Sequence, residues 1–195
     1  MVNSTNEMIR QTAFIFFLEK GYEGTKIRGI CEVVDIKASS LYFYYKSKEE
    51  LFFSIYDDIC SQNLKCRQDT MEAYKTAETS IKLYQLYKSM IIHCEQDIVK
   101  QKFLLRYHLF PPEEIKKVIL EKHKYWSVNE NSIILGIINE CLERKLLSDN
   151  RYAIDYLQEY LKIEKAQINE MIISNIKMSS AQLRLSWNRF WNSLM

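Results

Sequence analysis

Residues that interrupt helices are rare in this chain: four glycines and two prolines occur among 195 residues. A fold rich in β-strands needs many tight turns, and tight turns draw mainly on glycine and proline. Long helices joined by few loops need far fewer of them. Because 47% of the residues are hydrophobic, the chain can also bury a substantial core. The sequence therefore predicts an all-α fold of one or two compact units.

Charge and cysteine content exclude several classes of protein. The formal net charge is only +2, so any signal for nucleic acid has to be local. Five cysteines, an odd number with no CxxC pair, fit reduced thiols better than a disulfide framework. The polar first residues do not resemble a signal peptide, and charge-free runs of about ten residues are too short to cross a bilayer. We expect a cytoplasmic protein that has no membrane partner.

Two capping signals mark the starts of the first and fourth predicted helices. Ser4 and Glu7, and later Ser47 and Glu50, have the spacing of a capping box, in which side chains satisfy the free backbone donors of a first helical turn. Gly21 is expected to end the first helix, because glycine accepts left-handed backbone angles. The fourth helix contains no Gly or Pro, so it can connect the first domain to the rest of the chain.

Between these signals the sequence predicts two short helices. The first of them covers about residues 26–34, with Thr25 as its cap, and the second covers about residues 38–44 and buries Leu41 and Tyr45. The turn between them, residues 35–37, has only three residues. Short helices joined in this way are typical of a helix-turn-helix motif.

The rest of the chain is predicted to be helical as well. The composition becomes polar after about residue 68, and Pro111 and Pro112 are expected to start a helix. The last two helices should cover about residues 152–176 and 179–194. We divide the chain into an N-terminal three-helix, helix-turn-helix DNA-binding domain (residues 1–48), a connector helix (residues 49–68) and a C-terminal helical domain (residues 69–195).

Residues 21–51 read GYEGTKIRGICEVVDIKASSLYFYYKSKEEL. The GY-x-x-T start, the LY pair, the aromatic close of the third helix and the SKEEL start of the fourth resemble the DNA-binding signature of the TetR family of transcriptional regulators. Val34 and Asp35 stand where that family usually has small residues and Gly, and Tyr44 stands where His is common. The resemblance implies that residues 69–195 form a ligand-sensing and dimerisation domain. It also implies a homodimer that binds a palindromic operator as a repressor and releases it when a small-molecule effector binds.

The residues of this segment also suit DNA on physical grounds. Small side chains at positions 38–40 let a helix approach base edges in the major groove. Three lysines and no acid lie at positions 36–48, so this segment is locally basic. One of the three, Lys46, can equally be a solvated surface charge that does not contact DNA. The residues predicted to contact DNA bases or phosphates are Thr25, Lys26, Arg28, Lys37, Ala38, Ser39, Ser40, Tyr42, Tyr44 and Lys48.

The C-terminal part carries two further predictions. An aromatic stripe on the last helix favours burial against a partner chain, with an intramolecular core as the alternative. The predicted dimer-interface residues are Leu157, Leu161, Ile168, Ile172, Leu183, Trp187, Phe190 and Trp191. The family does not fix the effector pocket, and its candidate lining residues, each of which can equally be core or surface, are Tyr84, Tyr87, His93, Glu95, Arg106, Tyr107, His108 and Trp126.

Other functions stay open at this point. An enzyme is disfavoured because His93 and Cys94, being adjacent, point to different faces of a helix. His108 and His123 are weak candidates for a metal site, and we expect no metal and no cofactor. Two alternatives remain. One is a helical ligand-binding or interaction protein that does not touch DNA. The other is an effector-dependent activator, because whether an effector weakens or strengthens DNA binding depends on its relative affinities for two states of the protein.

Overall fold

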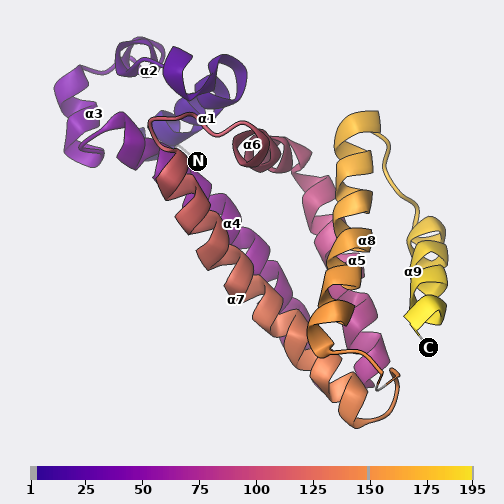
Figure 1. The fold of residues 1–195 in the computed structure, drawn as a ribbon. Coiled ribbons are helices and arrows are strands. Elements are labelled where there is room, and N and C mark those ends of the chain that lie inside the picture. The colour runs from indigo at the N-terminus through magenta and orange to yellow at the C-terminus, as the bar shows by residue number, and fades with distance from the viewer. Residues whose placement is uncertain (1–3, 149, 195) are drawn as a thin grey trace. The chain divides into compact units, whose positions relative to one another are not determined.

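The computed structural model describes residues 4–148 and 150–194 (Figure 1). Its described part contains nine helices and no strand, so the all-α prediction is confirmed. The helices are α1 (Thr5–Gly24), α2 (Ile27–Val34), α3 (Ala38–Tyr44), α4 (Lys48–Ala73), α5 (Thr79–Gln96), α6 (Ile98–Leu109), α7 (Lys116–Glu143), α8 (Ala153–Ser174) and α9 (Ser180–Leu194). None of the described helices is long and apolar enough to cross a membrane.

The chain forms two compact units. The first comprises the described residues up to Cys60 together with Phe103–Lys122, and the second comprises Ser61–Lys102 and the described residues from His123 onward. Helices α4, α6 and α7 each contribute residues to both units. The division expected from the sequence did not include the return of residues 103–122 to the first unit, because nothing in their local sequence indicates which distant helices they contact.

Aromatic rings fill the core of the first unit. Phe52 of α4 lies edge-on to Phe17 of α1, with ring centroids 5.1 Å apart, and to Tyr107 of α6, at 4.7 Å. The Tyr107 hydroxyl donates a hydrogen bond to the carbonyl of Phe17 (2.8 Å), and Arg106 donates to the carbonyl of Leu18 (3.0 Å). The second half of α6 therefore holds the end of α1 in place.

The helix starts predicted from serine caps are confirmed. Ser4 accepts a hydrogen bond from the backbone N–H of Glu7, and Ser47 accepts one from that of Glu50. The helix start predicted at Pro111 and Pro112 is wrong, because α7 begins at Lys116. A turn closed by the hydrogen bond from Ile115 N–H to the Pro112 carbonyl (3.1 Å) comes first. Each proline favours extended backbone in the residue before it, so two successive prolines shift the start of the helix to a later residue.

Gly21 lies inside α1 but has non-helical angles (φ 75°, ψ 174°), so the chain bends where the sequence predicted the helix to end. A Cβ atom added there would lie 3.0 Å from Nη2 of Arg106. Gly136 is different, because it is exposed on α7 and an added Cβ would meet nothing within 4 Å.

We expect the two glycines to respond oppositely to alanine. Gly21→Ala should lower the free energy of unfolding by about 1–2 kcal/mol, because an L-residue is strained at positive φ. Gly136→Ala should raise it by about 0.5–1 kcal/mol, because alanine restricts the unfolded chain and favours helix. Urea unfolding followed by circular dichroism measures both changes. A stabilised Gly21→Ala variant would contradict the assigned backbone angles.

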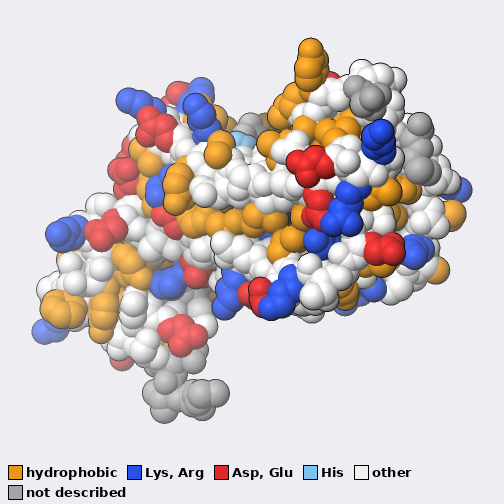
Figure 2. Space-filling view, turned by 90° about the horizontal axis from the view of Figure 1, so that it is seen from below, with side chains coloured by type: hydrophobic (Ala, Val, Ile, Leu, Met, Phe, Trp, Pro, Cys, Tyr) orange, Lys and Arg blue, Asp and Glu red, His pale blue; other side chains and the backbone are white. Residues whose placement is uncertain are grey.

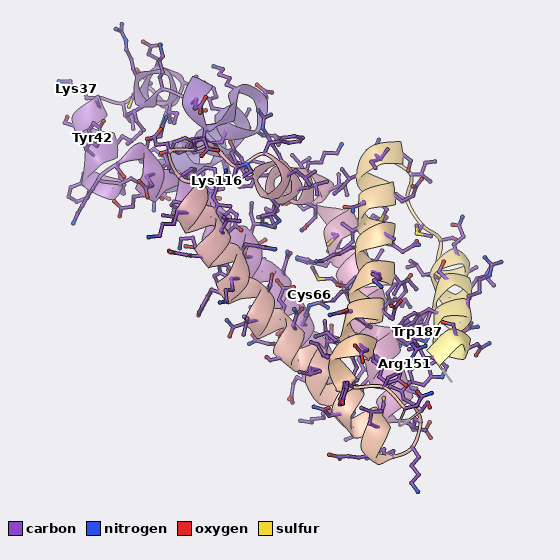
Figure 3. All side chains as sticks on the ribbon, viewed as in Figure 1. Lys37, Tyr42, Cys66, Lys116, Arg151 and Trp187 are labelled. Carbon is purple, nitrogen blue, oxygen red and sulfur yellow. The ribbon has the colours of Figure 1, made fainter. Side chains whose placement is uncertain are left out.

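The second unit is built around α5 and α8, with α9 packed against them. The indole ring of Trp187 on α9 lies 5.6 Å from the Tyr84 ring, 5.3 Å from the Tyr87 ring and 6.3 Å from the Tyr160 ring, measured between centroids. Trp187 is therefore part of the core of its own chain, which is the intramolecular alternative left open above (Figure 3).

Candidate DNA-binding site

The turn between α2 and α3 is made by Asp35. Its backbone is left-handed (φ 57°, ψ 51°), and both its own N–H and that of Ile36 donate to the Cys31 carbonyl. This arrangement ends α2 and redirects the chain into α3 within three residues. Asp accepts left-handed angles better than most residues, so the absence of glycine here leaves the helix-turn-helix geometry intact.

Two side chains fix the orientation of α3. Leu41 is completely buried, and Tyr45, directly after the helix, is also buried and donates a hydrogen bond from its hydroxyl to Asn6 Oδ1 (2.6 Å). The opposite face of α3 is consequently exposed. The predicted contact residues on or beside this helix that are exposed are Lys37, Ala38, Ser39, Ser40, Tyr42 and Tyr44.

Figure 3 shows Lys37 and Tyr42 projecting away from the body of the first unit. At the end of the space-filling view where α3 lies, hydrophobic and basic side chains are mixed on the surface (Figure 2). An exposed short helix with small residues at its start and a lysine before it can enter a major groove.

Phe43 belongs to the same surface and was missed in the sequence analysis. Its side chain is 84% exposed, and its ring centroid lies 5.4 Å from that of Tyr44. Its exposure could have been predicted from the sequence. Leu41 and Tyr45 lie one helical turn apart and point inward, so the position midway between them, 43, points outward. An exposed phenyl ring on such a helix can contact a thymine methyl group.

Thr25 does not cap α2, and that prediction is wrong. The N-cap residue is Lys26, which makes no side-chain capping bond, while the hydroxyl of Thr25 donates to the Gly21 carbonyl (2.7 Å). Only 1% of Thr25 is exposed. The bend at Gly21 provides the acceptor, which explains why the hydroxyl turns toward α1.

The basic residues of this unit are not equivalent. Lys26 is exposed, whereas Arg28 forms an exposed ion pair with Glu32 (2.9 Å). Lys48 donates to the Tyr22 carbonyl (3.0 Å), and its ammonium lies 4.1 Å from the centroid of the Tyr22 ring. Burial, together with Glu114 and Glu49, raises the pKa of Tyr22 to about 12. Lys48 therefore has a structural role beside any contact with phosphate.

The predicted effector-site residues are divided between the two units. Tyr84, Tyr87, His93 and Trp126 lie in the second unit, whereas Arg106 and Tyr107 lie in the first, with the α1 contacts described above. Glu95 pairs with Lys177 in the second unit, and His108 lies 2.8 Å from the Tyr56 hydroxyl in the first. The described residues contain no cluster of three His, Cys, Asp or Glu able to hold a metal ion.

The predicted interface residues fall into two groups. Leu157, Leu183 and Trp187 are buried in the core of their own chain. The half-buried members are Leu161, Ile168, Ile172, Phe190 and Trp191. The exposed aliphatic side chains on or beside the same two helices include Ile154 (49%), Ile173 (80%), Ile176 (64%) and Leu185 (52%). The sequence pattern could not separate the two groups, because α9 is apolar on more than one side.

Comparison with known proteins adds to this geometry. A family model described as "Bacterial regulatory proteins, tetR family" matches residues 9–55, which run from α1 into α4. The biofilm operon icaADBC HTH-type negative transcriptional regulator IcaR of Staphylococcus epidermidis is 44% identical over 46 residues, 24% of this chain and 25% of the relative. IcaR of Staphylococcus aureus (strain Newman) is 32% identical over 100 residues, 48% of this chain and 50% of the relative. The chain thus matches a quarter to a half of the length of these relatives.

Solved structures share the fold along nearly the whole chain. The TetR family transcriptional regulator PfmR from Thermus thermophilus has a TM-score of 0.71 at 17% identity, covering 99% of this chain and 97% of its own. The fatty acid degradation regulator FadR from Bacillus halodurans has a TM-score of 0.75 at 14% identity, covering 100% and 98%. Residues 9–55 thus match the model of the tetR family, and the chain as a whole shares the fold of these two regulators.

Proposed function

We propose that the protein is a repressor that binds a near-palindromic operator as a homodimer and releases it when a small molecule binds the second unit. The exposed face of α3 carries this proposal. Small residues and Lys37 stand at its start and aromatic rings at its end, a combination that offers both phosphate and base contacts. The relatives named as negative transcriptional regulators support repression rather than activation.

The dimer is supported by the exposed aliphatic side chains on α8 and α9 and in the segment between them. Ile173, Ile176 and Leu185 would be an aggregation hazard on a monomer, and a second copy of the same two helices would cover them. A two-fold partner would also present a second α3 about one turn of DNA away, which explains the need for a near-palindromic site.

Operator binding is tested with DNA flanking the chain's own coding sequence. We expect fluorescence anisotropy to detect a specific site whose affinity falls steeply between about 50 and 200 mM salt. Lys37→Ala should weaken binding and reduce the slope of log K against log salt by about one, because one phosphate contact is lost. Binding that is equally strong on unrelated DNA at every salt concentration would argue against a specific repressor.

Sedimentation of the same protein tests the dimer. Wild type should sediment as a dimer at micromolar concentration, and Leu185→Asp should shift it toward monomer, because a carboxylate would be buried in an apolar interface. Gln158→Asp, an exposed position on α8, serves as the matched control. A wild-type protein that sediments as a monomer would contradict the proposed two-fold dimer.

A further inference from the structure

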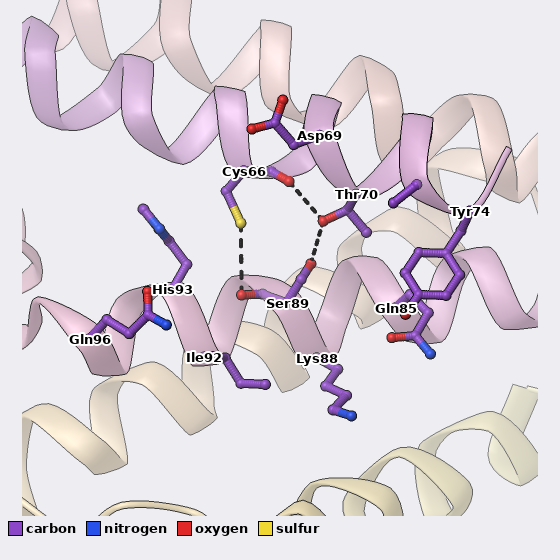
Figure 4. Close-up of a pocket in the computed structure, with 11 residues that line it drawn as sticks. Cys66, Asp69, Thr70, Tyr74, Gln85, Lys88, Ser89, Ile92, His93 and Gln96 are labelled. Atoms are coloured by element: carbon purple, nitrogen blue, oxygen red, sulfur yellow. Dashed lines mark hydrogen bonds between the residues drawn. The ribbon is translucent and has the colours of Figure 1, made fainter.

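The second unit has a groove between α4 and α5, but the charges along it do not converge (Figure 4). The Asp69 carboxylate and the Lys88 ammonium point away from one another on the outer sides of the two helices. At the centre, the Thr70 and Ser89 hydroxyl oxygens lie 2.8 Å apart, and the Cys66 thiol donates to the Ser89 carbonyl (3.7 Å). The residues drawn there therefore offer no pair of charges that one small ligand could bind.

Another cavity, of about 350 Å³, lies within the first unit, between the end of α1 and the end of α6. This volume is at the lower end of the range of about 300–1,000 Å³ that is usual for small-molecule sites. The cavity is lined by residues 20–24 and by Arg106, Tyr107, Phe110 and Pro112. Two of the residues predicted for an effector pocket, Arg106 and Tyr107, therefore line a cavity of the first unit.

Two features of α1 hold the guanidinium of Arg106 at this cavity. Its Nη1 donates a hydrogen bond to the Leu18 carbonyl (3.0 Å). Its Nη2 lies 3.0 Å from the point where a Cβ atom of residue 21 would stand, so the guanidinium uses space that Gly21 leaves open. Because the side chain is already ordered, a ligand that binds it loses less conformational entropy.

The charge of Arg106 is not neutralised within the described part of the chain. No described acid pairs with it, and its Nε and Nη2 donate to no described residue. These two nitrogens form a planar fork that matches a carboxylate. The other cation of the lining, Lys20, has its ammonium 3.6 Å from the centroid of the Phe16 ring. Glu23 lines the same cavity, so an anion with two charges would be repelled more than a monocarboxylate.

Phe110 supplies an apolar surface within reach of the same ligand. Its backbone N–H donates to the Arg106 carbonyl (2.9 Å), so the two side chains leave the end of α6 one helical turn apart and on the same side. Residues related in this way have Cβ atoms about 5–6 Å apart. The Phe110 side chain is 76% exposed, so its ring is open to a ligand. A carboxylate joined to an apolar body by a few bonds can meet both residues.

We propose that this cavity binds a small monocarboxylate with an aromatic or aliphatic body, its carboxylate on Arg106 and its body against Phe110. The site lies in the first unit, so it is separate from the effector site proposed above for the second unit. Its occupation requires no DNA, and its test is therefore independent of operator binding.

The test uses four related probes in calorimetric titrations of the full chain. 3-Phenylpropionate carries both groups, 3-phenylpropanamide replaces the carboxylate by a neutral amide, propionate lacks the ring, and phenyl phosphate carries a second charge. We expect 3-phenylpropionate to bind at least about tenfold more tightly than each of the others, because it alone combines a charge-assisted hydrogen bond with apolar contact. Equal binding of the amide or of phenyl phosphate, or no binding of 3-phenylpropionate at millimolar concentration, would overturn the proposal.

Two variants assign the contacts. Arg106→Gln should bind 3-phenylpropionate no better than the amide, and Phe110→Ala should bind it no better than propionate. Lys117→Gln, an exposed cation of α7 outside the cavity, should behave as wild type, and circular dichroism checks that each variant folds. Phe110→Ala keeps the test decisive even if Arg106→Gln does not fold, because the ring it removes is mostly exposed. Wild-type preferences in both variants, or an equal loss in all three, would contradict the site.

Discussion

Arg67→Ala is expected to lower the free energy of unfolding by about 3–5 kcal/mol. Arg67 lies on α4 with only 3% of its side chain exposed, and its guanidinium binds Glu164 of α8 through two hydrogen bonds of 2.5 and 3.2 Å and Glu130 of α7 at 3.1 Å. Burial lowers the pKa of Arg67, but Glu164, Tyr160 and Glu130 together raise it well above its ordinary value. Removing the cation would leave the buried Glu164 carboxylate without an opposite charge.

The comparison with a double variant separates this effect from loss of packing. Arg67→Met with Glu164→Gln removes the two most buried charges and leaves the Glu130 carboxylate, whose side chain is 17% exposed. The amide oxygen can still accept the hydrogen bond that Tyr160 donates to Glu164 (3.0 Å). The double variant should therefore be more stable than Arg67→Ala. Arg189→Ala, an exposed arginine on α9, should stay within about 0.5 kcal/mol of wild type in the same urea titration. If both Arg67 variants lost the same amount, the unpaired charge would not be the cause.

The helix-turn-helix could be predicted from the sequence because its determinants are local. Serine caps, the spacing of Leu41 and Tyr45, and the three-residue turn all act over one or two helical turns, and α3 begins and ends where they indicate. The exposed face of α3 follows from the same spacing. Thr25 was misassigned because its partner, the Gly21 carbonyl, becomes available only through the bend in α1.

The second unit was less accessible to sequence reasoning because its contacts join distant residues. Arg67 and Glu164 lie 97 positions apart, and no pattern pairs one buried arginine with one of many glutamates. The same holds for Tyr107 and Phe17, 90 positions apart, whose contact brings α6 into the first unit. Periodicity indicated that α9 is apolar, but only the packed structure shows that Trp187 faces α5 of its own chain.

Replacing Tyr42 and Phe43 together by alanine is expected to weaken operator binding by about 100-fold without lowering thermal stability. The two rings are 49% and 84% exposed, and Tyr42 has no partner among the described residues, so the fold loses little when they are removed. A specific base contact contributes about 1–3 kcal/mol, and about 1.4 kcal/mol corresponds to a factor of ten. Two such contacts therefore account for the expected loss.

The salt dependence distinguishes these rings from the lysines. Because neither ring neutralises a phosphate, the double variant should keep the wild-type slope of log K against log salt while losing affinity for the operator far more than for unrelated DNA. Tyr125→Ala on α7, whose side chain is 61% exposed, is the matched control and should leave both affinities unchanged. A uniform loss on all sequences, or a changed slope, would mean that α3 meets DNA through its backbone and lysines rather than through these two rings.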